Sequence, residues 1–185
     1  MPQASLTTPR LELVPLADEH LEDEIALDLD PEVMRFVGGP AETRAEVERA
    51  HVGRVRSADR VDGLGVWAGL ARGPEPAIDS FVGLWMLRPP HGPDQVFVEG
   101  EADLGYRLRR TWWRRGLGLE GAVALVRHGF DDLGLTRVFA QTLGTNAASR
   151  ALLTSLGMSY VGRVGADGSE VEYELRASLR SALDG

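Results

Sequence analysis

The 185-residue chain contains no cysteine and no lysine. Without cysteine it can form no disulfide, no thiolate metal site and no cysteine nucleophile. All 20 basic residues are therefore arginine, an imbalance to which we attach no mechanistic weight. Long apolar runs are also missing, since none approaches the roughly 20 residues of a membrane-spanning helix. Residues 1–10 lack the basic and apolar regions of a secretory signal, so we expect a cytoplasmic protein without a membrane partner.

Length and charge narrow the class of protein further. The length fits one domain over residues 1–185. A net charge of −8 and a pI near 5.0 argue against a general nucleic-acid binder, which would be basic. An acidic surface would suit a cationic substrate such as an amine. We expect no metal site, because no metal-ligand spacing links the four histidines, His20, His51, His91 and His128.

Hydrophobic periodicity predicts strands that alternate with helices. The expected strands are residues 10–16, 64–72, 80–87, 99–109, 136–143, 160–164 and 171–175. The expected helices are residues 19–29, 31–36, 41–56, 116–133 and 147–156, and Gly157 is placed to end the last one. A turn is expected at residues 73–76 and a loop at residues 89–93. This order implies an α+β or mixed α/β domain.

The most informative segment is a turn from a strand into a helix that is rich in arginine and glycine. Gly116 and Gly118 leave backbone amides unobstructed, and a helix N-terminus adds a favourable dipole for an anion. The surrounding arginines would add charge, although a solvated basic surface explains such a cluster equally well. The cluster consists of Arg107, Arg109, Arg110, Arg114 and Arg115.

Three interpretations of the glycines compete. A dinucleotide-binding G-x-G-x-x-G motif is complete because Gly121 supplies a third glycine, but that motif should follow an early parallel strand. A Walker A loop needs G-K-[ST], which is absent. A plain strand–helix turn is the simplest interpretation of the two glycines alone.

The whole of segment 104–120 resembles the acetyl-CoA signature of the GNAT N-acetyltransferases, in the form found in the ribosomal-protein N-terminal (Rim-type) subgroup. It departs from that pattern at Arg110, Arg114 and Leu119. The resemblance extends to residues 8–16, 30–36, 81–84 and 130–137 and to the motif over 146–158. The matching residues are Gly105, Tyr106, Leu108, Trp113, Arg115, Gly116, Gly118 and Glu120.

The resemblance implies the GNAT fold, a central, mostly antiparallel, splayed sheet of about seven strands flanked by about four helices. It implies an N-acetyltransferase that moves an acetyl group from acetyl-CoA to a primary amine, on a protein N-terminus or a small molecule, by direct attack. The pantetheine of the cosubstrate would pair with Leu108, Arg109 and Arg110, where the fourth and fifth strands splay. The pyrophosphate would bind the amides of Arg114, Arg115, Gly116, Leu117, Gly118 and Leu119.

Further site residues come from the same resemblance. Asn146 and Ser149 would line the far side of the pantetheine, although Asn146 alone equally predicts a helix N-cap. Many members carry a carboxylate at the position of Asp103, so we expect Asp103 first and Glu101 second as the general base. Two surface or ion-paired carboxylates are the alternative. Leu153 stands where many members have a proton-donating tyrosine, and Ser149 is the substitute that the subgroup suggests.

Other functions remain compatible with this sequence. The chain could be a non-catalytic acyl-CoA-binding module, or it could use another donor such as succinyl-CoA, which the arginines at 107–110 would suit. The acceptor pocket is expected between residues 30–56 and the 89–100 loop. A homodimer is one option for its assembly, since many members dimerise.

Overall fold

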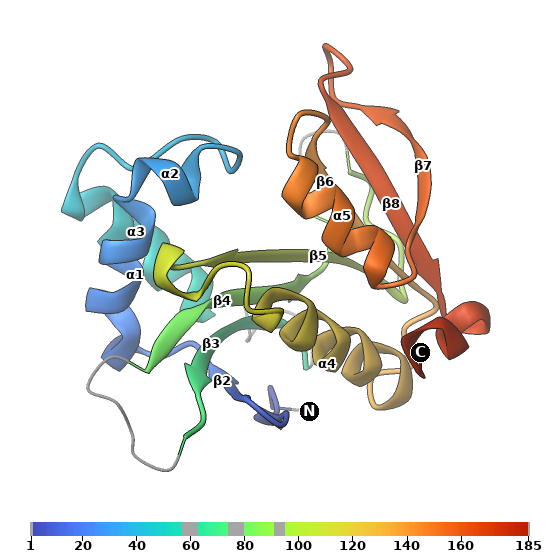
Figure 1. Ribbon diagram of the computed structural model, residues 1–185, viewed down its shortest axis with the longest axis horizontal. Coiled ribbons are helices and arrows are strands. Elements are labelled where there is room, and N and C mark those ends of the chain that lie inside the picture. The colour runs from blue at the N-terminus through green and yellow to red at the C-terminus, as the bar shows by residue number, and fades with distance from the viewer. Residues whose placement is uncertain (1, 57–62, 74–79, 91–94, 185) are drawn as a thin grey trace.

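The computed structural model describes residues 2–56, 63–73, 80–90 and 95–184 (Figure 1). Residues 74–76 of the predicted turn, His91 and part of the 89–100 loop lie outside these residues. The strands are β1 (Leu6–Thr7), β2 (Leu11–Pro15), β3 (Gly65–Ala71), β4 (Phe81–Arg88), β5 (Glu101–Leu108), β6 (Arg137–Leu143), β7 (Ser159–Val164) and β8 (Glu170–Arg176). The α-helices are α1 (Leu21–Asp28), α2 (Pro31–Met34), α3 (Arg44–Val55), α4 (Leu117–Asp131) and α5 (Ala147–Ser155). Short 3₁₀ turns are η1 (Asp18–His20), η3 (Arg110–Trp112) and η4 (Ala177–Asp184).

All eight strands form one sheet in the order β1-β2-β3-β4-β5-β6-β8-β7. Neighbouring strands are antiparallel except β5 and β6, which are parallel. This confirms the predicted mixed α/β fold with a mostly antiparallel sheet. The sequence did not predict β1, which has only two residues, and the fourth and fifth expected strands are therefore β5 and β6.

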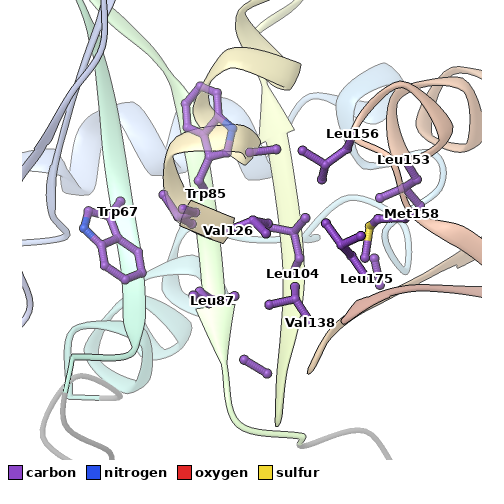
Figure 2. Packing of buried hydrophobic residues seen from close by; sticks show 14 of the residues in the cluster. Trp67, Trp85, Leu87, Leu104, Val126, Val138, Leu153, Leu156, Met158 and Leu175 are labelled. Atoms are coloured by element: carbon purple, nitrogen blue, oxygen red, sulfur yellow. The ribbon is translucent and has the colours of Figure 1, made fainter. Parts of the chain in front are cut away.

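Helices cover both faces of the sheet and bury two apolar layers. On one face, α4 and α5 pack against the sheet, and Val126 and Leu153 lie in one cluster with Trp85 and Leu104 (Figure 2). On the opposite face, Leu27 of α1 contributes to a second buried cluster with residues of β3 and β4. Because β4 is buried on both faces, nearly all of its residues are apolar.

Side-chain caps explain where several helices begin. Thr43 accepts a hydrogen bond from the Glu46 amide, so α3 begins at Arg44 rather than at residue 41. Asn146 caps α5 by accepting a hydrogen bond from the Ser149 amide, as expected for an N-cap. Gly157, with φ +87°, follows the end of α5 in the left-handed conformation that the sequence predicted.

The parallel pair β5–β6 is paired over three positions, Glu101↔Arg137, Ala102↔Val138 and Asp103↔Phe139. Beyond Asp103 the two strands diverge, while β6 continues to pair with β8 along its whole length. In Figure 1 the arm formed by β6, β7 and β8 turns away from the strands β2–β5. We call the divergence between residues 104–108 and 140–143 the splay.

Candidate functional site

The backbone of β5 beyond Asp103 faces the splay at alternate residues. The carbonyl of Gly100 accepts a hydrogen bond from the Thr136 amide (2.8 Å), and the Arg109 amide donates to the Val82 carbonyl on β4 (2.9 Å). Since backbone groups alternate in direction along a strand, the even-numbered residues Tyr106 and Leu108 face the splay. Of the three residues predicted to pair with pantetheine, Leu108 therefore has backbone groups that face the splay. Its carbonyl accepts a hydrogen bond from Trp113 Nε1 at 2.8 Å.

Three arginines of the basic cluster bind acidic side chains of the first helices. Arg107 Nε lies 2.7 Å from Asp28 Oδ1, Arg109 Nη2 lies 2.7 Å from Asp23 Oδ1, and Arg110 Nε lies 2.9 Å from Asp30 Oδ2. These ion pairs hold the end of β5 against α1 and the start of α2. Their charge is therefore offset by carboxylates, which removes the support that these arginines gave to a succinyl donor.

Arg114 and Arg115 instead belong to the turn that leads into α4. Arg114 has a φ of +58° and Gly116 a φ of +78°, and α4 starts at Leu117. A positive φ at a non-glycine residue such as Arg114 is strained, and such strain is often found at functional sites. The Arg115 guanidinium stacks on Trp112, 5.0 Å from the ring centroid.

The first turn of α4 provides donors for an anion. The first N–H groups of a helix have no partner inside the helix, and they point out of its positive end. The turn itself is braced from the N-terminal segment, because Arg10 Nη1 donates to the Arg115 carbonyl at 2.8 Å. Glu120 anchors this brace by accepting hydrogen bonds from Thr8 Oγ1 (2.6 Å) and Arg10 Nε (2.7 Å).

The start of α5 lies opposite β5. Asn146 Nδ2 donates to Thr142 Oγ1 at 3.2 Å, so this residue caps α5 and also joins it to β6. The Ser149 hydroxyl lies 2.9 Å from the phenolic oxygen of Tyr106, a hydrogen bond that links α5 to β5. Burial raises the pKa of Tyr106 to about 12, against a smaller opposing effect of the Ser149 hydrogen bond. Sequence reasoning gave Tyr106 no role, although it is one of the signature matches.

The two candidate bases share a face of β5 but have different partners. Glu101 lies 2.8 Å from Arg137, whose guanidinium also binds Glu172 and Glu174. Asp103 is buried, and the Nη2 of Arg88 on β4 is 4.0 Å from its Oδ2. Glu101 is therefore held in a tight network, while the ion pair of Asp103 with Arg88 is longer than a hydrogen bond.

The described histidines each have a carboxylate or backbone partner. His20 Nδ1 accepts from the Ala17 amide, while His51 and His128 contact Glu24 and Asp132. Across residues 2–56, 63–73, 80–90 and 95–184, no group of three or more side chains is arranged to hold a metal ion. Within the same residues, no helix combines the length and the apolar character needed to cross a membrane.

A groove of about 780 Å³ lies elsewhere, between residues 5–10 and one side of α4. It shares Gly116 and Leu119 with the phosphate-binding turn that the sequence predicts, but its lining includes neither Asp103 nor Ser149. The groove is therefore separate from the splay, and we place the candidate site at the splay.

Comparison with known proteins gives concordant matches. The family model described as an acetyltransferase (GNAT) domain matches residues 10–159. The FsC-acetyl coenzyme A-N(2)-transacetylase of Aspergillus fumigatus is 38% identical over 162 residues, which is 86% of this chain. The match spans 66% of that relative, so the chain covers just under two thirds of its length.

Solved structures share the fold. An acetyltransferase from Agrobacterium tumefaciens matches with a TM-score of 0.78 and 22% identity, over 95% of this chain and 96% of that one. A RimL ribosomal alpha-N-protein acetyltransferase in complex with coenzyme A matches with a TM-score of 0.74 and 16% identity, over 94% of this chain and 98% of that one. At these identities the structural matches establish the fold alone.

Proposed function

The chain belongs to the GNAT acetyltransferase family and is an acyltransferase, and from this premise we propose that it transfers an acetyl group from acetyl-CoA to a primary amine by direct attack. One observation carries the proposal. β5 and β6 pair only as far as Asp103, the start of α5 is joined to β5 by the Tyr106–Ser149 hydrogen bond, and the turn at Gly116 leads into α4. An extended thioester with a diphosphate at its other end fits such a combination of strand edge and helix N-terminus.

The binding of acetyl-CoA follows from these elements. The pantetheine lies along the β5 edge at Tyr106 and Leu108, whose backbone groups face the splay. The diphosphate lies on the amides of the turn and of the first turn of α4, where Gly116 has a positive φ and no Cβ to obstruct an anion. Arg114 and Arg115 add positive charge at the same place. The coenzyme A complex of the RimL structure supports this donor class.

Asp103 acts as the general base. An alkyl amine is mostly protonated at neutral pH, and a carboxylate near the thioester can take its proton directly or through water. Glu101 is the weaker candidate, because its bond to Arg137 at 2.8 Å stabilises the anion and lowers its readiness to accept a proton. Asp103 also lies closer along β5 to the residues that face the splay.

Ser149 assists departure of the thiolate. Its hydroxyl stands at the N-terminal turn of α5, whose dipole favours a negative charge. The Ser149 and Tyr106 hydroxyls are 2.9 Å apart and either can be the donor. In the proposed reaction Tyr106 donates to the Ser149 oxygen, and Ser149 gives its own proton to the sulfur as the carbon–sulfur bond breaks. Holding the amine and the thioester together can supply up to roughly 7–11 kcal/mol of barrier reduction, so these groups need only complete the reaction.

The acceptor is a primary amine, on a small molecule or a protein N-terminus. The name of the Aspergillus fumigatus relative supports acetyl-CoA as the donor and a nitrogen atom as the acceptor. The RimL structure supports a protein amine as the second acceptor class. We propose that an acidic chain with a net charge of −8 favours an amine over an anionic acceptor.

A thiol-release assay tests this function directly. Because the chain has no cysteine, a thiol reagent reports only the coenzyme A that is released. The purified protein is given acetyl-CoA and a panel of small amines and N-terminal peptides, and acetylated product is confirmed by mass. Amine-dependent thiol release supports the proposal. Binding of acetyl-CoA without transfer to any amine of the panel would favour an acyl-CoA-binding module instead.

A further inference from the structure

Arg88, the last residue of β4, lies beside the candidate base. It pairs with Asp103 across the β4–β5 ladder, so both side chains are on the face covered by α1 and α3. Its Nη2 is 4.0 Å from Asp103 Oδ2. Its Nε is buried and has no hydrogen-bond partner within the part of the chain that the structure describes. About a quarter of the side chain (26%) is exposed, so a ligand can reach it.

Other arginines on this face are bound far more completely. Arg107 contacts Asp28 at 2.7 Å and Glu24 at 3.4 Å, and Arg137 contacts three glutamates. Arg54 of α3 contacts both Glu24 and Asp28. Two carboxylates of α1 thus bind Arg54 and Arg107, and three glutamates of β5 and β8 bind Arg137. Within the described residues, Arg88 has one long ion pair, with the residue needed as a base.

A largely buried guanidinium with an unpaired Nε and only a long ion pair has a free-energy cost. Burial lowers the pKa of Arg88, the nearby Arg54 lowers it further, and Asp103 opposes the shift. Buried polar groups are almost always hydrogen-bonded, and an unpaired donor loses the full energy of hydration. When Asp103 accepts a proton during catalysis, Arg88 also loses its counter-charge. A ligand oxygen beside Asp103 would give Arg88 a hydrogen-bond acceptor and would offset its charge when Asp103 is protonated.

We propose that Arg88 binds a carbonyl or carboxylate oxygen of the amine acceptor, next to the nitrogen that Asp103 deprotonates. The inference rests on the proposed function and narrows its acceptor class. In such an acceptor two carbon atoms separate the amine nitrogen from the oxygen. The nitrogen can therefore face Asp103 while the oxygen faces Arg88, because Arg88 Nη2 and Asp103 Oδ2 are 4.0 Å apart. The planar guanidinium suits either oxygen type, because it donates to carbonyls and to carboxylates.

The test compares three small acceptors that differ only beside the amine. Glycinamide carries a carbonyl, glycine a carboxylate and ethylamine neither group, and kcat/KM is corrected for the unprotonated fraction of each amine. We expect the wild type to prefer glycinamide or glycine over ethylamine, and the preferred one identifies the oxygen type. Arg88→Met should lower that preference by about tenfold or more while leaving KM for acetyl-CoA unchanged, as expected for loss of a charge-assisted hydrogen bond.

Arg163→Met is the matched control, because Arg163 is exposed on β7 and donates to the Gly168 carbonyl. It should keep the wild-type preference. Absence of any preference in the wild type, or an equal loss for all three acceptors in Arg88→Met, would overturn the inference. If Arg88→Met does not fold, Arg88→Lys is used instead, because it keeps the charge but loses the planar set of guanidinium donors. A reduced preference in Arg88→Lys supports the inference, and an unchanged preference contradicts it.

A binding measurement separates this inference from the proposed function. In the presence of coenzyme A, calorimetry compares the product N-acetylglycinamide with N-ethylacetamide, in the wild type and in Arg88→Met. Weaker binding of N-acetylglycinamide to the variant, with N-ethylacetamide unaffected, supports the role of Arg88 even if no amine is acetylated. Equal binding of N-acetylglycinamide to both proteins rejects it, whether or not the wild type is an active transferase.

Discussion

The phenolic oxygen of Tyr106 lies 2.9 Å from the hydroxyl oxygen of Ser149, so two side chains 43 residues apart join β5 to α5 across the splay. The bond connects the strand that would hold the thioester to the helix that would stabilise the leaving thiolate. This places Tyr106 where it can orient Ser149.

Replacing Tyr106 with phenylalanine tests this relationship. We expect kcat to fall about tenfold while acetyl-CoA affinity is kept, because only the hydrogen bond to Ser149 is lost. Ser149→Ala should give a similar loss, and the double variant should lose little more, since both groups act on one proton. Steady-state kinetics and calorimetry measure the two quantities. Additive losses in the double variant would show that the two hydroxyls act independently.

The same variant has a predicted effect on alkaline stability. The folded pKa of Tyr106 is raised from 10.0 to about 12 by burial, so folding favours the neutral phenol. That contribution is complete below pH 10 and is lost as the pH rises toward about 12. Tyr106→Phe should therefore lose less stability than the wild type over this window. Denaturant unfolding at several alkaline pH values measures the difference, and parallel curves for the two proteins would refute it.

Asp103 and Glu101 should differ strongly in their effect on turnover. Asp103→Asn should lower kcat by about 100-fold or more, the usual contribution of a general base, with acetyl-CoA affinity unchanged. Glu101→Gln should have a smaller effect on kcat, because Glu101 is bound to Arg137 at 2.8 Å. Thiol release measures kcat for both variants, and calorimetry measures their affinity for acetyl-CoA. A larger loss in Glu101→Gln would exchange their assigned roles.

Replacing Gly121 with alanine should change the stability of the fold rather than the binding of the cosubstrate. A Cβ added at this residue would lie 2.5 Å from Trp85 Nε1, so Gly121→Ala should destabilise the fold by about 1–3 kcal/mol through overpacking. Gly53→Ala is the control: it lies in α3 with nothing within 4 Å of the added Cβ, and should stabilise by about 0.5–1 kcal/mol. Urea unfolding compares them, and equal effects would contradict the packing argument.

Glu120 should contribute to acid stability. Burial raises its pKa, but hydrogen bonds from Thr8 and from the amide and guanidinium of Arg10 outweigh this and lower the pKa below its ordinary value. A lowered folded pKa gives stability above the unfolded value of 4.5 that is lost as the pH falls through the folded value. Glu120→Gln should therefore flatten the loss of stability below pH 4.5. Unfolding curves at acidic pH measure this, and an unchanged slope would exclude Glu120 as a contributor.

Local features of the fold could be predicted from the sequence, because their causes are local. Asn146 and Gly157 mark the start and end of α5 through capping and a positive φ. Gly121 completed a dinucleotide-binding pattern by spacing, yet its side of α4 packs on Trp85. The short β1 had no pattern to predict it, because two residues show no periodicity.

Contacts that span the chain could not be predicted in this way. The arginines at 107, 109 and 110 formed one basic cluster in the sequence, but each binds an acidic residue 79–86 positions away. Which carboxylate each arginine meets depends on how α1 and α2 dock on the sheet. The contrast between Glu101 and Asp103 depends likewise on Arg137 and Arg88, which lie on two other strands.

Binding of acetyl-CoA tests the central claim most directly. We predict that calorimetric titration of the purified wild type gives saturable binding of acetyl-CoA with micromolar affinity, and no binding of NADH. That result would support the splay and the turn at Gly116 as the site of an acyl-CoA. A folded protein that releases no heat with acetyl-CoA would contradict the account and leave the turn at Gly116 as a structural connection between β5 and α4.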